Sequence, residues 1–339
     1  MYRKLFILSF ICIVLASCER EFEIRDLDGG PKFYIESVFR NDQDMVDILV
    51  MPTRYIAEKP VEVSVPEGMT LKVKVDGEEV EVKKLEGMTD DDSYAKFRWS
   101  VEGGFQPGSE IEISAEADGY PKAASTVRIP EPFNDFTCKV EKVGADESLL
   151  HIDYKDDPES DDYFAVTVIR NVRCVRFDGT VDTEASYPII NFRSSDDFGD
   201  YPYTHINLPG ENWPEFLNLV FWNDSRATDA QGMQRFSIYI SEMHSEEARE
   251  YTEPTLGGSG EVIGTIYCRD YVTVYRLAPE TYRYLNGLWN EDYNDLAHLG
   301  MAPPTFAYTN ITGGIGAFVP MTSSEPQKIE WYKTGSDSI

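Results

Sequence analysis

Cys18 is the residue whose type and position predict a specific chemistry. It ends the run Leu15-Ala16-Ser17-Cys18, which has the pattern of a bacterial lipobox, with small residues between the leucine and the cysteine. A thiol is required there because its sulfur takes a diacylglycerol through a thioether, and cleavage before the cysteine frees an amine for a further acyl chain. Each buried methylene contributes about 0.8 kcal/mol, so several chains form a lasting anchor. We therefore predict that Cys18 is lipidated.

The segment before Cys18 has the character of a secretory signal. Arg3 and Lys4 precede a mostly apolar run over residues 5–15, and a basic start followed by a short apolar segment is the secretory pattern. The run is shorter than the roughly 20 residues that a helix needs to span a bilayer. Residues 1–17 are predicted to be a removed signal peptide, and residues 18–31 a flexible tether. The alternative is a plain secretory signal followed by an accidental cysteine.

Three later cysteines carry no motif of their own. Cys138, Cys174 and Cys268 are widely spaced and form no CxxC pair, so neither zinc nor redox chemistry is assigned. Because the number is odd, one disulfide with a free thiol and three separate thiols both remain open. Each cysteine lies in a strand-like segment, which favours buried packing.

Carboxylates are densest between residues 153 and 162, and carboxylates on a loop could bind calcium. The spacing is not that of an EF-hand and lacks its glycine, so a solvated acidic loop is the favoured interpretation. Shorter acidic runs at 90–92 and 196–197 are interpreted as loop tips. Paired carboxylates could also serve a glycosidase, but among 60 acidic residues such pairs arise by chance. The cluster consists of Asp153, Asp156, Asp157, Glu159, Asp161 and Asp162.

The remaining motifs favour no catalytic, metal or cofactor site. Gly257-Gly258-Ser259-Gly260 lacks the lysine of a phosphate loop, and Gly314-Ile315-Gly316 lacks the third glycine of a dinucleotide fingerprint. The second run is interpreted as a tight turn or bulge. No GxSxG or HExxH motif occurs, and we predict a protein that is not an enzyme. The four histidines, interpreted as ordinary surface or packed residues, are His151, His205, His244 and His298.

The aromatic side chains are more informative about binding than these motifs. Aromatic platforms bind sugars and anchor protein interfaces. Packing in a β-rich core is the alternative, and it is favoured for Trp222 and Trp289. Trp213, between Asn212 and Pro214, is expected to be exposed. The set consists of Tyr201, Tyr203, Trp213, Trp222, Tyr282, Tyr284 and Trp289.

The composition limits the partners and the number of domains. A net charge of −29 predicts an acidic surface that repels nucleic acid and anionic lipid. A hydrophobic content of 42% with 13% aromatic residues argues against a disordered chain. Removal of the signal leaves roughly 320 residues, which suggests two or three domains.

The sequence predicts a mainly β fold. Short alternating segments and the turns Asp76-Gly77 and Asp118-Gly119-Tyr120-Pro121 predict an immunoglobulin-like sandwich over residues 32–130, with strands that include 61–65 and 71–75. A proline-rich linker leads to a larger β-rich domain at 133–334. Its period changes near residue 279, which predicts a helix over about 279–298. The strands expected in this domain are 136–140, 149–154, 163–172, 187–192, 215–222, 236–240, 262–268, 271–275, 317–319 and 329–332.

The order of these landmarks resembles the DUF4249 lipoproteins of Bacteroidetes-type bacteria. The resemblance covers nearly the whole chain after the signal. The landmarks are Cys18, a strand at 33–38, Gly119-Tyr120-Pro121, Ile129-Pro130, Asp156-Asp157-Pro158-Glu159, Asp162-Tyr163-Phe164, Tyr282-Arg283-Tyr284-Leu285, Asn310-Ile311 and Gly314-Ile315-Gly316-Ala317-Phe318.

The resemblance implies a lipoprotein of the outer membrane or cell surface with no established catalytic residues. Family members are often encoded beside TonB-dependent receptors, which implies an accessory binding role in uptake. Glu19, Glu21 and Glu23 are similar to a surface-export signal, although Arg20 and Phe22 interrupt it. The expected partners are a membrane, through Cys18, and a TonB-dependent receptor. The alternatives are an adhesin-like structural surface protein and an enzyme with unrecognised acidic catalysis.

Overall fold

The computed structural model describes residues 30–53, 64–85, 97–143, 147–155, 157, 159–188, 190–194, 202–207, 216–224, 231–241, 249–252, 260–292 and 308–329. This part of the chain is mainly β and contains one helix, which confirms the mainly β character of the predicted fold class. The predicted signal peptide, Cys18 and nearly all of the predicted tether lie outside the described residues. In the described part, no helix has the length and apolar character needed to cross a membrane.

The N-terminal strands form two sheets that share one apolar core. Phe33, Ile35 and Ile48 on one sheet are buried against Val73 and Ile113 on the other. The first group, part of a large sheet, consists of β1 (Phe33–Arg40), β2 (Met45–Pro52), β6 (Arg98–Glu102) and β5 (Val82–Lys84). The second sheet consists of β4 (Glu78–Val80), β3 (Thr70–Val75), β7 (Glu110–Glu116) and β8 (Ala123–Arg128).

Both predicted turns join neighbouring strands. Asp76 and Gly77 have φ angles of 51° and 84°, and two positive φ angles are what a tight turn between antiparallel strands requires. The turn that contains Gly119 connects β7 to β8. The predicted strand at 61–65 is not seen: residues 61–63 lie outside the described part, and 64–65 are irregular.

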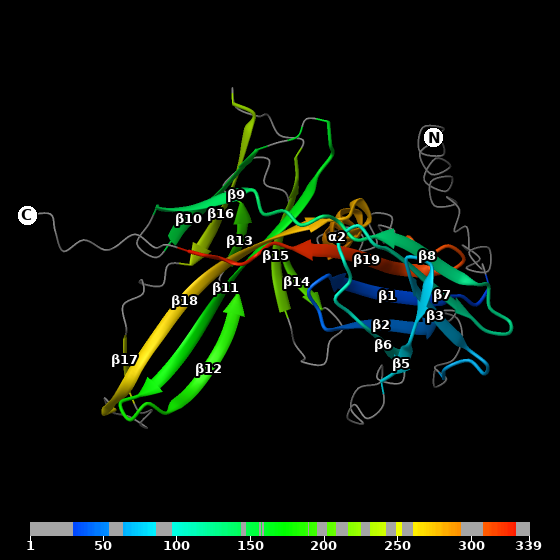
Figure 1. The fold of residues 1–339 in the computed structure, drawn as a ribbon, viewed down its shortest axis with the longest axis horizontal. Helices are drawn as coiled ribbons and strands as arrows, with labels where there is room; N and C mark the ends of the chain where they lie inside the picture. Colours follow the sequence, from blue (N-terminus) through cyan, green and yellow to red (C-terminus); the bar gives the residue numbers. More distant parts are fainter. Residues whose placement is uncertain are drawn as a thin grey trace, which may run out of the picture.

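A strand from the C-terminal part completes the N-terminal sheet. β19 (Ile315–Ser323) pairs with β1 in parallel, with Ile35 opposite Gly316. The predicted boundary between residues 32–130 and 133–334 assigns β19 to the second domain, whereas the pairing joins it to the first (Figure 1). A Cβ at Gly316 would lie 2.1 Å from the carbonyl oxygen of Ile35. The glycine run therefore allows two backbones to approach closely.

A second core lies beyond the linker. Phe164, Val166 and Val274 of the large sheet are buried against Ile152 and Ile238 of a separate four-stranded sheet. That sheet consists of β13 (Ile190–Ser194), β16 (Met233–Ser241), β10 (Glu147–Lys155) and β9 (Phe136–Lys142). The large sheet contributes β14 (Pro202–Asn207), β15 (Phe216–Asn223), β11 (Tyr163–Arg176) and β18 (Val262–Leu277). The strand predicted at 187–192 divides between β13 and the end of β12 (Val181–Pro188).

Helix α2 (Pro279–Asp292) covers the opposite face of the large sheet (Figure 1). Its predicted start is confirmed, and residues 293–298 lie outside the described part. Proline at the first helical position loses no hydrogen bond, and the Thr281 hydroxyl donates to the carbonyl of Pro320 at 2.5 Å. Tyr284 and Leu285 are buried against Ala317 and other apolar residues of the sheet.

The longest strands continue past both cores as a projecting arm. β11 and β18 pair over their whole length, β12 flanks β11, and β17 (Arg249–Thr252) and β20 (Gln327–Lys328) pair with β18. We call the distal part, residues 171–186, 249–252 and 262–271, the arm; it extends away from the body (Figure 1). The two strands predicted at 262–268 and 271–275 are one strand, because Asp270 pairs with buried Arg170 instead of ending it.

Candidate functional site

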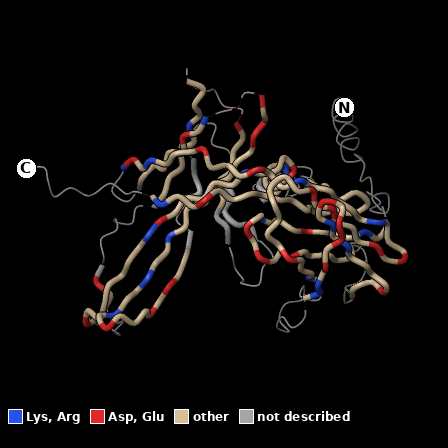
Figure 2. The backbone as a smooth tube through the Cα atoms, in the orientation of Figure 1, with Lys and Arg blue, Asp and Glu red and all other residues tan. Residues whose placement is uncertain are grey.

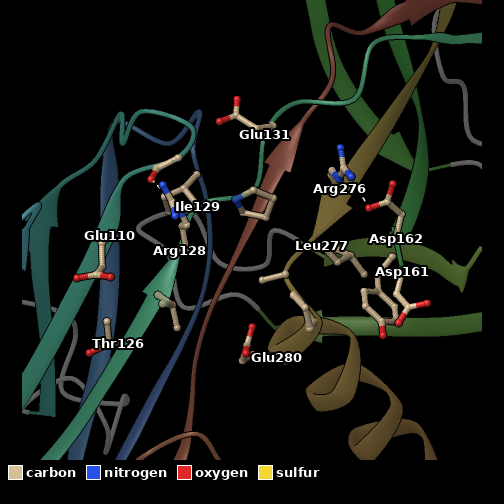
Figure 3. Close-up of a pocket in the computed structure, with 16 residues that line it drawn as sticks. Glu110, Thr126, Arg128, Ile129, Glu131, Asp161, Asp162, Arg276, Leu277 and Glu280 are labelled. Atoms are coloured by element: carbon tan, nitrogen blue, oxygen red, sulfur yellow. Dashed lines mark hydrogen bonds and ion pairs between the residues drawn. The ribbon is translucent and has the colours of Figure 1, made fainter. Parts of the chain in front are cut away.

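One hollow lies at the seam between the N-terminal sheets and the second core. It has a volume of about 670 Å³ and brings together carboxylates from β7, the linker and the start of α2 (Figure 3). Arg276 forms an ion pair with Asp162, whose carboxylate also accepts a hydrogen bond from Ser160. Arg128 donates to the carbonyl of Gly108 at 2.9 Å. Both arginines of the described lining therefore already have partners, and neither is free to bind an anionic ligand.

The predicted acidic cluster is dispersed by the fold. Asp153 lies on β10 and forms a two-pronged pair with Arg235, with distances of 2.5 and 2.8 Å. This hydrogen bond lowers the pKa of Asp153. Asp161 and Asp162 line the seam, Asp157 accepts from the backbone N–H of Glu159, and Asp156 lies outside the described part. Among the described residues, no group of His, Cys, Asp and Glu could hold a metal ion.

The described histidine and tryptophan residues have structural surroundings. His151 is buried, with Nδ1 2.8 Å from the Ser237 hydroxyl and Nε2 3.1 Å from Glu141. Trp222 is fully buried and stacks on Phe236 at 4.0 Å, which confirms the packing interpretation. The other three histidines and Tyr201, Tyr203, Trp213 and Trp289 have no described side chain.

The predicted aromatic residues on α2 also contribute to packing. Tyr282 stacks on Tyr163 at 4.7 Å, and its hydroxyl accepts from Asn223. Buried Tyr284 donates to Glu36 at 2.8 Å. These tyrosines join the helix to the sheet and do not form an exposed platform.

The three strand cysteines are free thiols; Cys174 is buried as predicted, whereas Cys138 and Cys268 are only partly buried. Burial, with a smaller contribution from Asp153, raises the pKa of the Cys138 thiol to about 12. Because the thiolate is the reactive form, Cys138 in the native protein should resist maleimide at pH 8 and react after unfolding in guanidinium. Peptide mapping of the labelled protein measures this difference, with Cys138→Ser as the blank. Labelling of native Cys138 would contradict a raised thiol pKa at this partly buried position.

The arm carries a second hollow, of about 440 Å³, on the sheet face that continues from beneath α2. Alternate residues of a strand share a face, and the pairing register aligns Arg173 with Tyr267, Asn171 with Arg269, and Arg173 with Glu184. Tyr271 lies beside Arg269 on the same face of β18. The residues that form the arm site are Asn171, Arg173, Glu184, Tyr267, Arg269 and Tyr271.

The charged side chains of the arm site are accessible to solvent. Arg173, Arg269 and Glu184 are exposed, and Tyr267 exposes 47% of its surface. Neither arginine forms an ion pair with a residue that the structure describes, unlike Arg176, which pairs with Asp182 on the other face of β11 at 2.6 Å. Figure 2 shows basic positions along the inner strands of the arm and acidic positions near its edges and tip.

Sequence reasoning missed this site. Arg173 and Tyr267 are far apart in the chain, and only the antiparallel register of β11 and β18 makes them neighbours. The available signal was weak: alternation places Tyr267, Arg269 and Tyr271 on one face of a single strand. The prediction of one strand ending at Cys268 and another beginning at Tyr271 assigned these three residues to separate elements.

The tip of the arm adds exposed apolar surface. Phe177 exposes 73% of its surface and Val181 38%. The intervening turn is ordered by hydrogen bonds from the backbone N–H of Thr180 to Asp178 and from that of Gly179 to Arg176. Exposed aromatic residues are enriched at protein recognition surfaces.

Solved structures with some likeness share little of this geometry. The apo structure of Bacteroides uniformis beta-glucuronidase 3 has a TM-score of 0.18 and 12% identity, covering 75% of this chain and 24% of that chain. Bovine butyrophilin has a TM-score of 0.17 and 11% identity, covering 73% and 91%. The Danio rerio Fcho1 Mu homology domain with bound Eps15 peptide has a TM-score of 0.15 and 10% identity, covering 88% and 94%. Such low scores carry no argument about function.

A comparison with curated protein sequences finds no match. The profile described as "Domain of unknown function (DUF4249)" matches residues 19–327. The match begins directly after Cys18 and includes the N-terminal sheets, the second core, the arm and β19. This chain therefore belongs to the DUF4249 family.

Proposed function

We propose that the protein is a non-enzymatic lipoprotein of the outer membrane or cell surface, and that it is an accessory binding component of a TonB-dependent uptake system. The observation that carries the proposal is the arm, which projects from the body and exposes a hollow lined by arginine and tyrosine. These side chains recognise ligands or partners well. They are poor candidates for a nucleophile with its base. The seam hollow, by contrast, has its two arginines already engaged.

The anchor and the partner class rest on the sequence. Cys18 in the lipobox supports attachment to a membrane through acyl chains. The resemblance to a family often encoded beside TonB-dependent receptors supports a transporter as the partner. We further propose that the N-terminal sheets, with β19 added, form an immunoglobulin-like base that presents the arm.

Co-purification tests the transporter association. Tagged protein extracted from outer membranes in mild detergent should bring down a β-barrel receptor, and deletion of its gene should cause a growth defect on the nutrient of that receptor. A Cys18→Ala form, expressed in the same cells, controls for receptors that adhere after extraction. Absence of both the receptor and the defect would sink the transporter role.

The proposed anchor predicts a change of fractionation. Replacing Cys18 with alanine removes the sulfur that takes the lipid, so the protein should move from the membrane pellet to the soluble fraction. Replacing Cys12 with alanine is a matched control, because Cys12 lies within the predicted signal and should leave the distribution unchanged. Immunoblots of the two fractions measure the result, and membrane retention of the Cys18→Ala protein would count against lipidation.

A further inference from the structure

The arm site has the size of a ligand site. A hollow of about 440 Å³ lies on the face formed by β11, β12 and β18, and ligand sites commonly occupy about 300–1,000 Å³. Tyr267 and Tyr271 are four residues apart on β18, which corresponds to about 13 Å along a strand. A ligand that contacts both tyrosines must therefore be longer than one sugar ring or one amino acid.

The two arginines select the charge of the ligand. Arg173 and Arg269 are diagonal neighbours on adjacent strands, since Arg173 lies opposite Tyr267 and Arg269 opposite Asn171. A guanidinium binds a carboxylate or sulfate through paired N–H donors, and neither arginine is in an ion pair with a described residue. Charges separated by more than about 8 Å are largely screened at physiological salt. The local arginine pair therefore acts on a ligand at the projecting arm more strongly than the net charge of −29 does.

The other side chains suit a hydroxylated ligand. Tyr267, with 47% of its surface exposed, offers an apolar ring with a polar hydroxyl. The Ser186 hydroxyl donates to the Asn171 amide oxygen at 2.8 Å and so orients that amide within the site. Glu184 is exposed and accepts hydrogen bonds from hydroxyl groups. Aromatic rings beside amide and carboxylate groups match the alternating apolar and hydroxyl-bearing faces of a sugar.

From this combination, we propose that the arm site binds an acidic oligosaccharide, with Arg173 and Arg269 holding its carboxylate or sulfate groups and Tyr267 and Tyr271 contacting its rings. This ligand class deepens the proposed binding function and rests on it. It requires no receptor, because all of the residues named lie on one arm of this chain.

Titration calorimetry on the purified full-length chain tests the ligand class. The acidic probes are hexagalacturonate and a heparin hexasaccharide, the neutral probes are cellohexaose and maltohexaose, and hexaglutamate represents an acidic peptide. At least one acidic sugar should bind about tenfold or more tightly than the neutral sugars, because charged hydrogen bonds contribute more than neutral ones. Its affinity should fall as salt rises. Absence of binding by both acidic sugars, equal binding of neutral sugars, or tighter binding of hexaglutamate would overturn the proposal.

Substitutions locate the binding on the arm. Arg173→Ala and Arg269→Ala should each weaken binding of the acidic sugar about tenfold, whereas Arg176→Ala, on the opposite face of the same strand, should not. Tyr267→Ala should weaken binding and Tyr267→Phe should retain it. An equal loss in Arg176→Ala would assign the binding to something other than this site.

The two proposals fail separately. A chain that brings down a receptor but binds no acidic sugar would retain the transporter role and lose this ligand class. A chain that binds the sugar through Arg173 and Arg269 but associates with no receptor would retain the ligand site alone. Thermal unfolding of each variant checks that exposed substitutions leave the fold intact.

Discussion

Replacing Asp270 with alanine is expected to reduce the free energy of unfolding by about 3–5 kcal/mol. Asp270 and Arg170 lie directly opposite each other on β18 and β11, and their side chains expose only 3% and 1% of their surface. Two hydrogen bonds, at 2.7 and 2.6 Å, join the guanidinium to both carboxylate oxygens. Loss of the carboxylate would leave a buried guanidinium without its counter-charge, and this uncompensated charge causes the large cost.

A paired substitution separates the value of the ion pair from the cost of breaking it. Arg170→Met combined with Asp270→Leu removes both charges and should be much more stable than Asp270→Ala, because replacing a buried pair with apolar residues is often neutral. Urea unfolding followed by circular dichroism measures all three proteins. Equal destabilisation of the single and double variants would show that the charge is not the cause.

Gly316→Ala should produce the second large effect. Gly316 has a φ of +97°, and an added Cβ would meet the carbonyl oxygen of Ile35 at 2.1 Å. That oxygen belongs to the backbone of β1, so the contact can be relieved only if the strands separate. The overlap should cost about 1–3 kcal/mol, and the left-handed backbone conformation should add about 1–2 kcal/mol.

Gly119→Ala isolates the backbone contribution. Gly119 has a φ of +83° and open space around the position of a Cβ, so its substitution should carry only the conformational cost. Thermal unfolding of both variants and the parent gives the difference. If Gly316→Ala were no more destabilising than Gly119→Ala, the close approach of β19 to β1 would not constrain the fold.

Local sequence patterns predicted the positions of strands and of the helix better than they predicted which strands pair. Asp76-Gly77 supplied a hairpin signal whose geometry needs only two neighbouring residues, and Pro279 with the apolar spacing after it predicted the start of α2. β19 was expected as a short strand near 317–319, but no local pattern states that it pairs with β1. The pairing depends on Gly316, whose close contact with Ile35 appears only after the chain has folded.

The sequence singled out aromatic side chains as a class but did not locate the arm site. Binding platforms and core packing were both considered for them, with packing favoured for Trp222, and Trp222 and Tyr284 are buried. The arm site instead uses Arg173, Tyr267 and Arg269, which belong to separate stretches of sequence. A polar residue such as Asp270 within a long strand looked like a break, because its buried partner Arg170 is 100 positions away.

The pairing of β1 with β19 also determines when this sheet can form during folding. Asn41 accepts a hydrogen bond from the backbone of Ser323, 282 positions later, so this sheet reaches its final form only when almost the entire polypeptide is present. Contacts between such distant positions slow folding, because a long loop must close before the contacts stabilise it. Until β19 is added, β1 would have an unpaired edge, and unpaired strand edges promote association between chains. Truncation before residue 315 should therefore leave an aggregation-prone protein, even though the arm and its site precede the cut.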